Sequence, residues 1–361
     1  MSGVKASVIG TFVVWGRISP DGAMATTTLN VAAAVAGTYA PDGTTRTLPG
    51  IDLNTTAIGG NLFLTALQQL YWYDGGATPP QYRLIDSGVT SASGQHYAGP
   101  SATGSAIEVD MVSYVANGVA TTWQSGSGGA PAVSRTLASV PSGATAVGWN
   151  TWLDSTGNLY HGNAIMAVGV TSAMTQHAVD ANGTAQDWIT YADAFRGYAT
   201  TALNGSPVTP RYFLFPSGGS VKRRVVGWGT FLAENGELHI FSEAGALTTI
   251  AGVADASALH VSTPGGLDRA LVSYVTTDGT AVWSETGGTS RSQFIGAGAR
   301  AAGGTAFLGT DAKLWLGSTL FSTAAIIATD VQSANGYHQA DGGAAGQNWV
   351  GWTQRLPSQC L

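Results

Sequence analysis

Histidines are the first side chains to consider for chemistry, because imidazole carries protons and binds metals near neutral pH. None belongs to a His-Glu-x-x-His motif, and no pair stands at metal-ligand spacing with a carboxylate. His161 and His239 closely follow turn glycines, which favours a place in a repeated strand. We therefore expect no metal and no other cofactor. The six histidines are His96, His161, His177, His239, His260 and His338.

Neither a covalent nucleophile nor a catalytic acid pair is indicated. The segment Gly99-Pro-Ser101-Ala-Thr-Gly104 lacks the Gly-x-Ser-x-Gly spacing of a nucleophile elbow. Paired carboxylates that met at a central channel would suit a polysaccharide hydrolase or lyase. Aspartates favour turns, however, because their side chains accept hydrogen bonds from nearby backbone N–H groups. We expect that role for the acids near strand or hairpin ends, which are Asp110, Asp154, Asp193, Glu234, Asp278 and Asp311.

One aromatic segment, Tyr71-Trp72-Tyr73-Asp74-Gly75, is suited to binding a ligand. Consecutive residues of a strand point to opposite faces of the sheet, so three aromatic rings in a row cannot all face one core. An exposed ring beside an aspartate could stack on a sugar. The predicted ligand-binding residues are therefore Tyr71, Trp72, Tyr73 and Asp74, with a glycan as ligand. Core packing or a subunit contact is the alternative.

Composition favours short strands over helices. Charged residues make up 10% of the 361-residue chain, glycine occurs 50 times, and 44% of the residues are hydrophobic. Such a chain can bury a core but is poor in the Lys, Glu and Arg that support helix surfaces. The net charge of −6 argues against nucleic-acid binding, which needs a basic face. The single cysteine, Cys360, excludes an intrachain disulfide, and no apolar run is long enough to span a membrane.

A strand–turn–strand pattern recurs along the chain. It consists of a short apolar strand, a turn centred on Gly, and a strand with an aromatic residue, as in Val112-Ser-Tyr-Val-Ala-Asn-Gly118. Asn-Gly and Asp-Gly between alternating strands are strong hairpin signals. Gly118, Gly157 and Gly236 are separated by 39 and 79 residues, which predicts a degenerate copy between the last two. We expect hairpin turns near residues 22, 68, 118, 157, 197, 236, 279 and 312.

A second motif indicates that the two ends of the chain share a sheet. Val147-Gly-Trp-Asn-Thr-Trp-Leu153 returns as Val226-Gly-Trp-Gly-Thr-Phe-Leu232 and as a closing strand near residues 350–356, with a looser copy at Val13-Val-Trp-Gly-Arg-Ile-Ser19. A period of about 40 residues is typical of four-stranded propeller blades. We predict an all-β chain forming one domain over residues 1–361, a closed β-propeller of seven or eight blades. Tryptophans at repeat-equivalent places should pack between blades; they are Trp123, Trp149, Trp228, Trp283, Trp315 and Trp352.

The strand–turn–strand units, such as Thr230-Phe-Leu-Ala-Glu-Asn-Gly-Glu-Leu-His-Ile240, resemble the repeats of RCC1-like propellers. In that family a hydrophobic strand, an Asp-Gly or Asn-Gly turn and an aromatic strand build each blade. The family's Gly-Gln-Leu-Gly segment is absent, and the repeat is shorter. The resemblance therefore implies the fold but not a chromatin or nucleotide-exchange function.

In overall style the chain is similar to tail-associated or receptor-binding proteins of phages that infect high-GC bacteria. It is rich in Ala, Gly and Thr, poor in charge and rich in Trp. This resemblance implies a non-enzymatic virion protein for adhesion or tail assembly, at the virion or extracellular surface. Its partners would be other virion or surface proteins and a cell-surface glycan, and it would act as an oligomer within an assembly. The alternatives are a secreted lectin and a polysaccharide hydrolase or lyase.

Overall fold

The computed structural model describes residues 11–17, 35–39, 45–49, 55–100 without 75–76 and 79–80, 106–126, 131–203 without 181, 206–261 without 217 and 243–244, 269–317 without 286–287, 324–339 and 347–355. In these ranges every regular element is a β-strand apart from one short 3-10 helix, η1 (Gly218–Ser220), so the all-β prediction is confirmed. Among the described residues, no helix is long and apolar enough to cross a membrane.

Four antiparallel sheets, called the short sheets, have first and second strands of three to five residues. Each has four strands in chain order from the centre outward. The first strand of the second short sheet also pairs in parallel with the first strand of the next long sheet, through Gly148 and Thr175, so these two sheets are joined into one. Their strands are β4 (Thr56–Gly59), β5 (Leu62–Leu64), β6 (Gln69–Asp74) and β7 (Gln81–Ser87); β12 (Thr145–Gly148), β13 (Thr151–Leu153), β14 (Leu159–His161) and β15 (Ala164–Ala167); β21 (Arg223–Gly227), β22 (Thr230–Ala233), β23 (Leu238–Phe241) and β24 (Leu247–Ile250); β29 (Arg300–Gly303), β30 (Ala306–Leu308), β31 (Leu314–Gly317) and β32 (Ala324–Ala328).

Four long sheets alternate with the short ones, and their first two strands run for 8 to 12 residues. Their strands are β8 (Val89–Pro100), β9 (Ala106–Ala116), β10 (Val119–Gln124) and β11 (Val133–Leu137); β16 (Ser172–Val179), β17 (Ala185–Ala192), β18 (Arg196–Leu203), β19 (Ser206–Pro207) and β20 (Arg211–Leu214); β25 (Val253–Val261), β26 (Arg269–Thr276), β27 (Thr280–Glu285) and β28 (Arg291–Phe294); β33 (Val331–Gln339), β34 (Gln347–Arg355) and β1 (Thr11–Arg17). A further hairpin joins β2 (Val35–Tyr39) to β3 (Thr45–Pro49).

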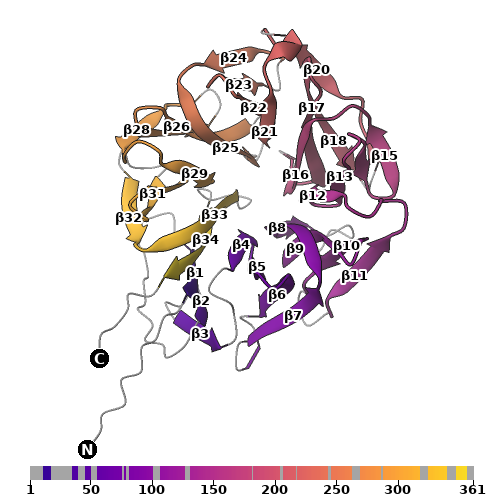
Figure 1. Ribbon diagram of the computed structural model, residues 1–361, viewed down its shortest axis with the longest axis vertical. Coiled ribbons are helices and arrows are strands. Elements are labelled where there is room, and N and C mark those ends of the chain that lie inside the picture. The colour runs from indigo at the N-terminus through magenta and orange to yellow at the C-terminus, as the bar shows by residue number, and fades with distance from the viewer. Residues whose placement is uncertain are drawn as a thin grey trace, which may run out of the picture.

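The sheets are arranged around a common centre (Figure 1). Their first strands contact one another in the order β4, β8, β12, β16, β21, β25, β29 and β33, and β33 also contacts β4. The N-terminal strand β1 pairs with the C-terminal strand β34 in antiparallel register, with Val13 opposite Thr353. Repeated four-stranded antiparallel sheets in this arrangement are consistent with a β-propeller.

Glycines allow each short sheet to approach the long sheet that follows it. Gly227 ends β21 at a register shift with a φ of 150°, and a Cβ there would overlap the carbonyl oxygen of Ala258 on β25. A larger residue would therefore force the two backbones apart. The same overlap occurs at the equivalent positions Gly59, Gly148 and Gly303, against Gly94, Thr175 and Gly336.

Hydrogen bonds join each short sheet to the long sheet that precedes it. Two residues before each of these glycines, a backbone N–H donates to a side-chain oxygen. That oxygen belongs to a residue near the start of the first strand of the preceding long sheet. The four bonds are Ala146 N to Ser91 Oγ at 3.0 Å, Val225 N to Ser172 Oγ at 2.9 Å, Ala301 N to Asp255 Oδ2 at 3.0 Å, and Ala57 N to Ser333 Oγ at 3.3 Å. The last bond connects segments from opposite ends of the described chain.

Left-handed backbone conformations occur at six of the eight expected turns, at Gln68, Gly118, Gly157, Gly236, Gly279 and Ala312. Asn117 also has a φ of 50°, so both residues of this Asn-Gly turn have positive φ, as a type I′ hairpin requires. The turn expected near Gly22 lies outside the described residues.

The turn expected near residue 197 lies at residues 193–195, between β17 and β18, and Gly197 itself is the second residue of β18. In this turn the backbone N–H of Asp193 donates to the carbonyl oxygen of Arg196 at 3.0 Å. The Asp193 carboxylate shapes this turn by accepting the N–H groups of Phe195 and Arg196, each at 2.7 Å. Gly197 instead makes room for Phe213, whose ring would lie 2.6 Å from an added Cβ.

The core consists of apolar clusters between adjacent sheets, and several pairs of aromatic rings bridge two sheets. Trp123 lies 5.4 Å from Trp72, and Trp283 lies 5.9 Å from Phe307, measured between ring centroids. Trp123 therefore packs against the preceding sheet and Trp283 against the following one, so these two tryptophans are not equivalent as the sequence pattern indicated. Trp149 and Trp228 are equivalent, since each follows a close-approach glycine in the first turn of a short sheet.

Candidate functional site

A histidine occupies the same register position in the first strand of each long sheet. These residues are His96, His177, His260 and His338, and the sequence separations between them are 81, 83 and 78 residues. The cross-strand partners are Asp110, Asp187, Ala270 and Asn348. Two of the four sheets thus pair a histidine with an aspartate near the centre. The side chain of His338 lies outside the described residues.

Asp110 is the acceptor of the first cluster. It lies in the middle of β9 and is buried, so the expectation that it marks a strand end is wrong. Oδ1 accepts the backbone N–H of Asn61 at 3.0 Å and lies 3.1 Å from His96 Nδ1. Oδ2 accepts the Asn61 side-chain amide and the Trp72 indole N–H, each at 2.8 Å. Four donors from two sheets therefore converge on one buried carboxylate, which satisfies its charge.

The charge of the first cluster is distributed between His96 and Asp110. Burial alone would lower the pKa of His96, but its hydrogen bonds to Asp110 and Glu108 outweigh burial and raise the pKa to about 9. Burial alone would raise the pKa of Asp110, and the contacts with His96, Asn61 and Trp72 reverse that effect and lower it. At neutral pH the cluster is therefore an ion pair inside the protein.

Asp187 of β17 is the acceptor of the second cluster, and two histidines contact it. Its Oδ1 lies 2.5 Å from His177 Nδ1, and its Oδ2 lies 3.2 Å from His161 Nε2. These contacts outweigh burial and hold the pKa of Asp187 below its ordinary value. His161 comes from β14, the third strand of the preceding short sheet. Trp72 of the first cluster likewise comes from β6, the third strand of the short sheet before it. Thr151 lies 3.1 Å from His161 Nδ1 and so limits rotation of that ring.

The long sheets are also joined directly near the centre. The side-chain amide of Gln95 donates to the carbonyl of His177 at 2.9 Å and accepts its backbone N–H at 2.9 Å. Gln176 makes the same pair of bonds to His260, at 3.2 and 2.7 Å. The His260 ring is stacked on Trp188 with centroids 3.5 Å apart. The backbone of each of these two histidines is thus held by a glutamine of the preceding long sheet.

The predicted glycan residues do not form one surface. Tyr73 is buried, and its ring lies 5.3 Å from Tyr82. Tyr71 is half-buried beside the same ring, whereas Trp72 points to the opposite face and donates to Asp110. Asp74 pairs with Arg83 at 2.8 Å. A ligand-binding role of Tyr71, Trp72, Tyr73 and Asp74 stays a prediction.

Several of the other predicted acids serve turns. Asp154 Oδ1 accepts the backbone N–H groups of Thr156 and Asn158, each at 2.9 Å, and Asp311 accepts that of Lys313 at 3.2 Å. Asp278 accepts the N–H of Thr280 at 3.1 Å. Within the described part of the chain, no group of three or more His, Cys, Asp or Glu side chains is placed to hold a metal ion.

Large apolar side chains are exposed on the outermost strands of the sheets. Leu84, Ile165 and Ile326 are 51%, 56% and 42% exposed. They are the cross-strand partners of Tyr71, Tyr160 and Trp315, next to a register shift that occurs at the same place in three short sheets. The fourth short sheet has Thr249 opposite His239 and no such shift. Other exposed residues of outermost strands are Val133 on β11, Tyr212 and Leu214 on β20, and Phe294 on β28.

No family model and no curated protein matches the chain. Among solved structures, one titled "Crystal structure of BBS1N in complex with ARL6DN, soaked with lead" is 12% identical, with 86% of this chain and 95% of that chain covered and a TM-score of 0.37. The same complex "soaked with mercury" is 10% identical, with 76% and 99% covered and a TM-score of 0.34. "Structure of a Post-proline cleaving enzyme from Rickettsia typhi" is 10% identical, with 72% and 44% covered and a TM-score of 0.33. These likenesses carry no information on activity.

Proposed function

We propose that the chain is a closed eight-bladed β-propeller that acts by binding, with short and long sheets as alternating blades. The cyclic contacts of the eight first strands support closure, as does the hydrogen bond from Ala57 to Ser333. The pairing of β1 with β34 supports it further, because it uses both ends of the chain in one blade. Such closure protects strand edges that an open array would expose.

The exposed apolar side chains of the outermost strands carry the proposal of a binding function. Leu84, Ile165 and Ile326 take equivalent places in three blades, so the outer wall presents a repeated apolar feature. Exposed apolar side chains that recur at one structural position favour an interaction role over chance exposure. The buried carboxylates Asp110 and Asp187 bind side chains of the preceding sheet and so hold blades together, which fits a scaffold that binds through its outer surface.

The role we propose for this scaffold is that of a tail-associated adhesion or receptor-binding protein of a phage. It would function as an oligomer within the virion, in contact with other virion proteins and a cell-surface glycan. The overall compositional resemblance to such proteins supports this role, together with the apolar outer wall.

The experiment measures association of the purified chain with cell-envelope fractions of high-GC bacteria by cosedimentation, and self-association by analytical ultracentrifugation. Replacing Leu84, Ile165 and Ile326 with Thr should weaken whichever association is found. Threonine is chosen because the fourth short sheet has Thr249 opposite His239 in its outermost strand. The matched control replaces Leu67, Val119 and Val168 with Thr, because these apolar side chains are also exposed but do not lie on outermost strands. A chain that neither binds envelope nor self-associates, or an outer-wall variant that behaves like the control, would contradict the proposal.

A further inference from the structure

The long sheet β16–β20 differs from the other sheets in its outer part. After β18 the chain forms the two-residue strand β19 and then β20, and both pair with β18. Figure 1 shows β20 at the periphery of the molecule. Phe195, Arg196, Tyr198, Tyr212 and Leu214 lie at this edge and are together called the rim patch.

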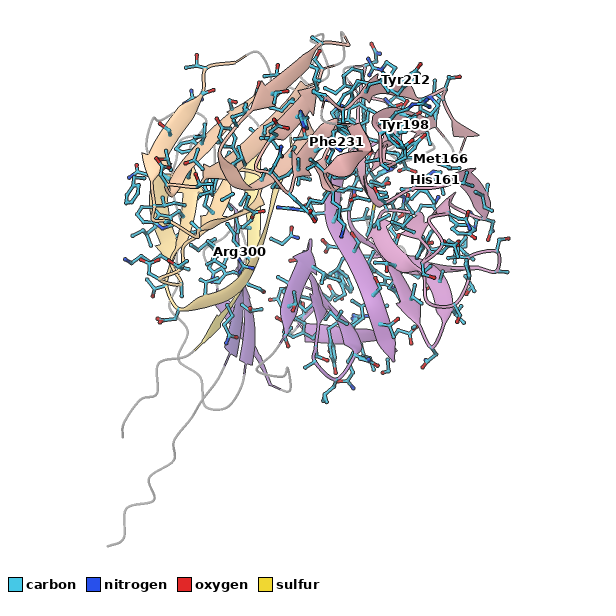
Figure 2. The ribbon with its side chains drawn as sticks, turned by 45° about the horizontal axis from the view of Figure 1, so that its top comes forward. His161, Met166, Tyr198, Tyr212, Phe231 and Arg300 are labelled. Carbon is cyan, nitrogen blue, oxygen red and sulfur yellow. The ribbon has the colours of Figure 1, made fainter. Side chains whose placement is uncertain are left out.

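The register of β18 and β20 places four of the five side chains on one face of the sheet. Arg196 is opposite Leu214, and Tyr198 is opposite Tyr212. Tyr198 is half-buried and stacked on Tyr191 of β17, with ring centroids 4.6 Å apart and an interplanar angle of 7°. The Tyr212 ring lies 6.1 Å from the Tyr198 ring, measured between centroids, and Tyr212 is 59% exposed. Figure 2 labels both residues. The exposed ring is thus supported from below by a rigid aromatic pair.

Arg196 supplies an available positive charge beside this ring. Its guanidinium carbon lies 5.4 Å from the centre of the Tyr212 ring, and one of its nitrogens lies 3.5 Å from the Tyr198 hydroxyl. Within the described part of the chain, Arg196 makes no ion pair. The nearby carboxylate of Asp193 accepts two backbone N–H groups and the Tyr198 hydroxyl at 2.9 Å, and its charge also attracts the Arg196 guanidinium without an ion pair between them. The guanidinium can therefore give several of its donors to an incoming anion.

We propose that the rim patch binds an acidic saccharide, with a sugar ring on Tyr212 and its carboxylate on Arg196; this rests on the proposed function of the chain as a binding scaffold. The apolar face of a pyranose ring matches a flat exposed aromatic surface. A sugar carboxylate matches the planar donor fork of arginine. On a chain of net charge −6, a guanidinium beside an exposed ring favours an anionic ligand at this place.

Isothermal titration calorimetry with a galacturonic acid trisaccharide and with the uncharged galactose trisaccharide tests the proposal. The acidic sugar should bind, and the neutral one should bind at least about tenfold more weakly because it lacks the charge-assisted hydrogen bonds. Tyr212→Ala should abolish measurable binding of both. Arg196→Gln should bind the two sugars with similar, weak affinity. The control is Phe294→Ala, since Phe294 is an equally exposed aromatic residue on β28 and should leave binding unchanged.

Two results would overturn the inference. In one, neither trisaccharide binds; in the other, Tyr212→Ala binds as the unmodified protein does. If the chain still adheres to envelope fractions in either case, the binding function stands and only the saccharide site is wrong. If the chain adheres to nothing, the proposed function fails as well. Circular dichroism and the unfolding temperature of each variant establish that the fold is kept.

Discussion

Raising the pH from 6.5 to 9.5 should lower the free energy of unfolding because folded His96 holds its proton more tightly than unfolded His96. The pKa of His96 is about 9 in the folded protein, against about 6.5 for a solvated histidine. Each pKa unit corresponds to about 1.4 kcal/mol, so the protonated histidine contributes about 3 kcal/mol. The contribution is complete below pH 6.5 and is lost as the pH rises to 9. His96 is almost wholly buried, so solvent screens this effect little.

Urea unfolding at constant ionic strength, followed by tryptophan fluorescence in half-unit pH steps, measures this loss. His96→Gln removes the titrating group, so its free energy of unfolding should be lower at pH 6.5 but nearly constant up to pH 9. The matched control is His239→Gln. Burial lowers the pKa of His239, so neutral His239 contributes to the free energy of unfolding above about pH 6.5, and this contribution is lost on acidification. The His239→Gln variant should therefore still lose stability between pH 6.5 and 9, as the unmodified protein does. Equal slopes between pH 6.5 and 9 in unmodified protein and His96→Gln would refute the reasoning.

Three further outcomes can be checked by thermal or urea unfolding. Gly227→Ala should destabilise the protein by about 3 kcal/mol because the new Cβ overlaps the neighbouring backbone. Gly143→Ala should cost only about 1 kcal/mol because Gly143 has open space around it. Equal losses of stability in the two variants would contradict the close approach at Gly227. Trp283→Ala should cost about 3–5 kcal/mol, as expected for a fully buried ring, and a loss below 1 kcal/mol would show that the site is not packed. Ser333→Ala should cost about 1–2 kcal/mol by removing the hydrogen bond that joins the first and last sheets and the one between Ser333 Oγ and Thr353 Oγ1, and no loss at all would contradict both bonds.

The hairpins could be predicted because their signals are local. Asn117 and Gly118 both adopt the positive φ that an Asn-Gly turn predicts, and the matched segments near Val13 and Val350 lie on strands that pair with each other. Spacing placed the turn before β18 only approximately, because no glycine marks it. There a side chain, Asp193, replaces glycine as the residue that shapes the turn.

The buried clusters are formed by contacts between sheets, so no local pattern contains them. Asn61 lies in the turn between β4 and β5 and Trp72 lies on β6, and only the stacking of their sheet on the next one brings them to Asp110 of β9. One signal was nevertheless present in the sequence. The separations of 81 and 83 residues that connect His96, His177 and His260 are about twice the hairpin period, which fits a repeat of two sheets and not of one. The search for short motifs misses a spacing of that length.

The pairing of β1 with β34 has a consequence for biosynthesis. Thr11 to Arg17 are among the first described residues to leave the ribosome, but their partners, Trp349 to Arg355, are among the last. The N-terminal strand must therefore wait, with its edges unpaired, while the intervening sheets are synthesised. Contacts of such long sequence separation form slowly, and waiting strands are vulnerable to aggregation. Truncating the chain before residue 347 during translation should consequently leave a product that needs chaperones, whereas the completed chain does not.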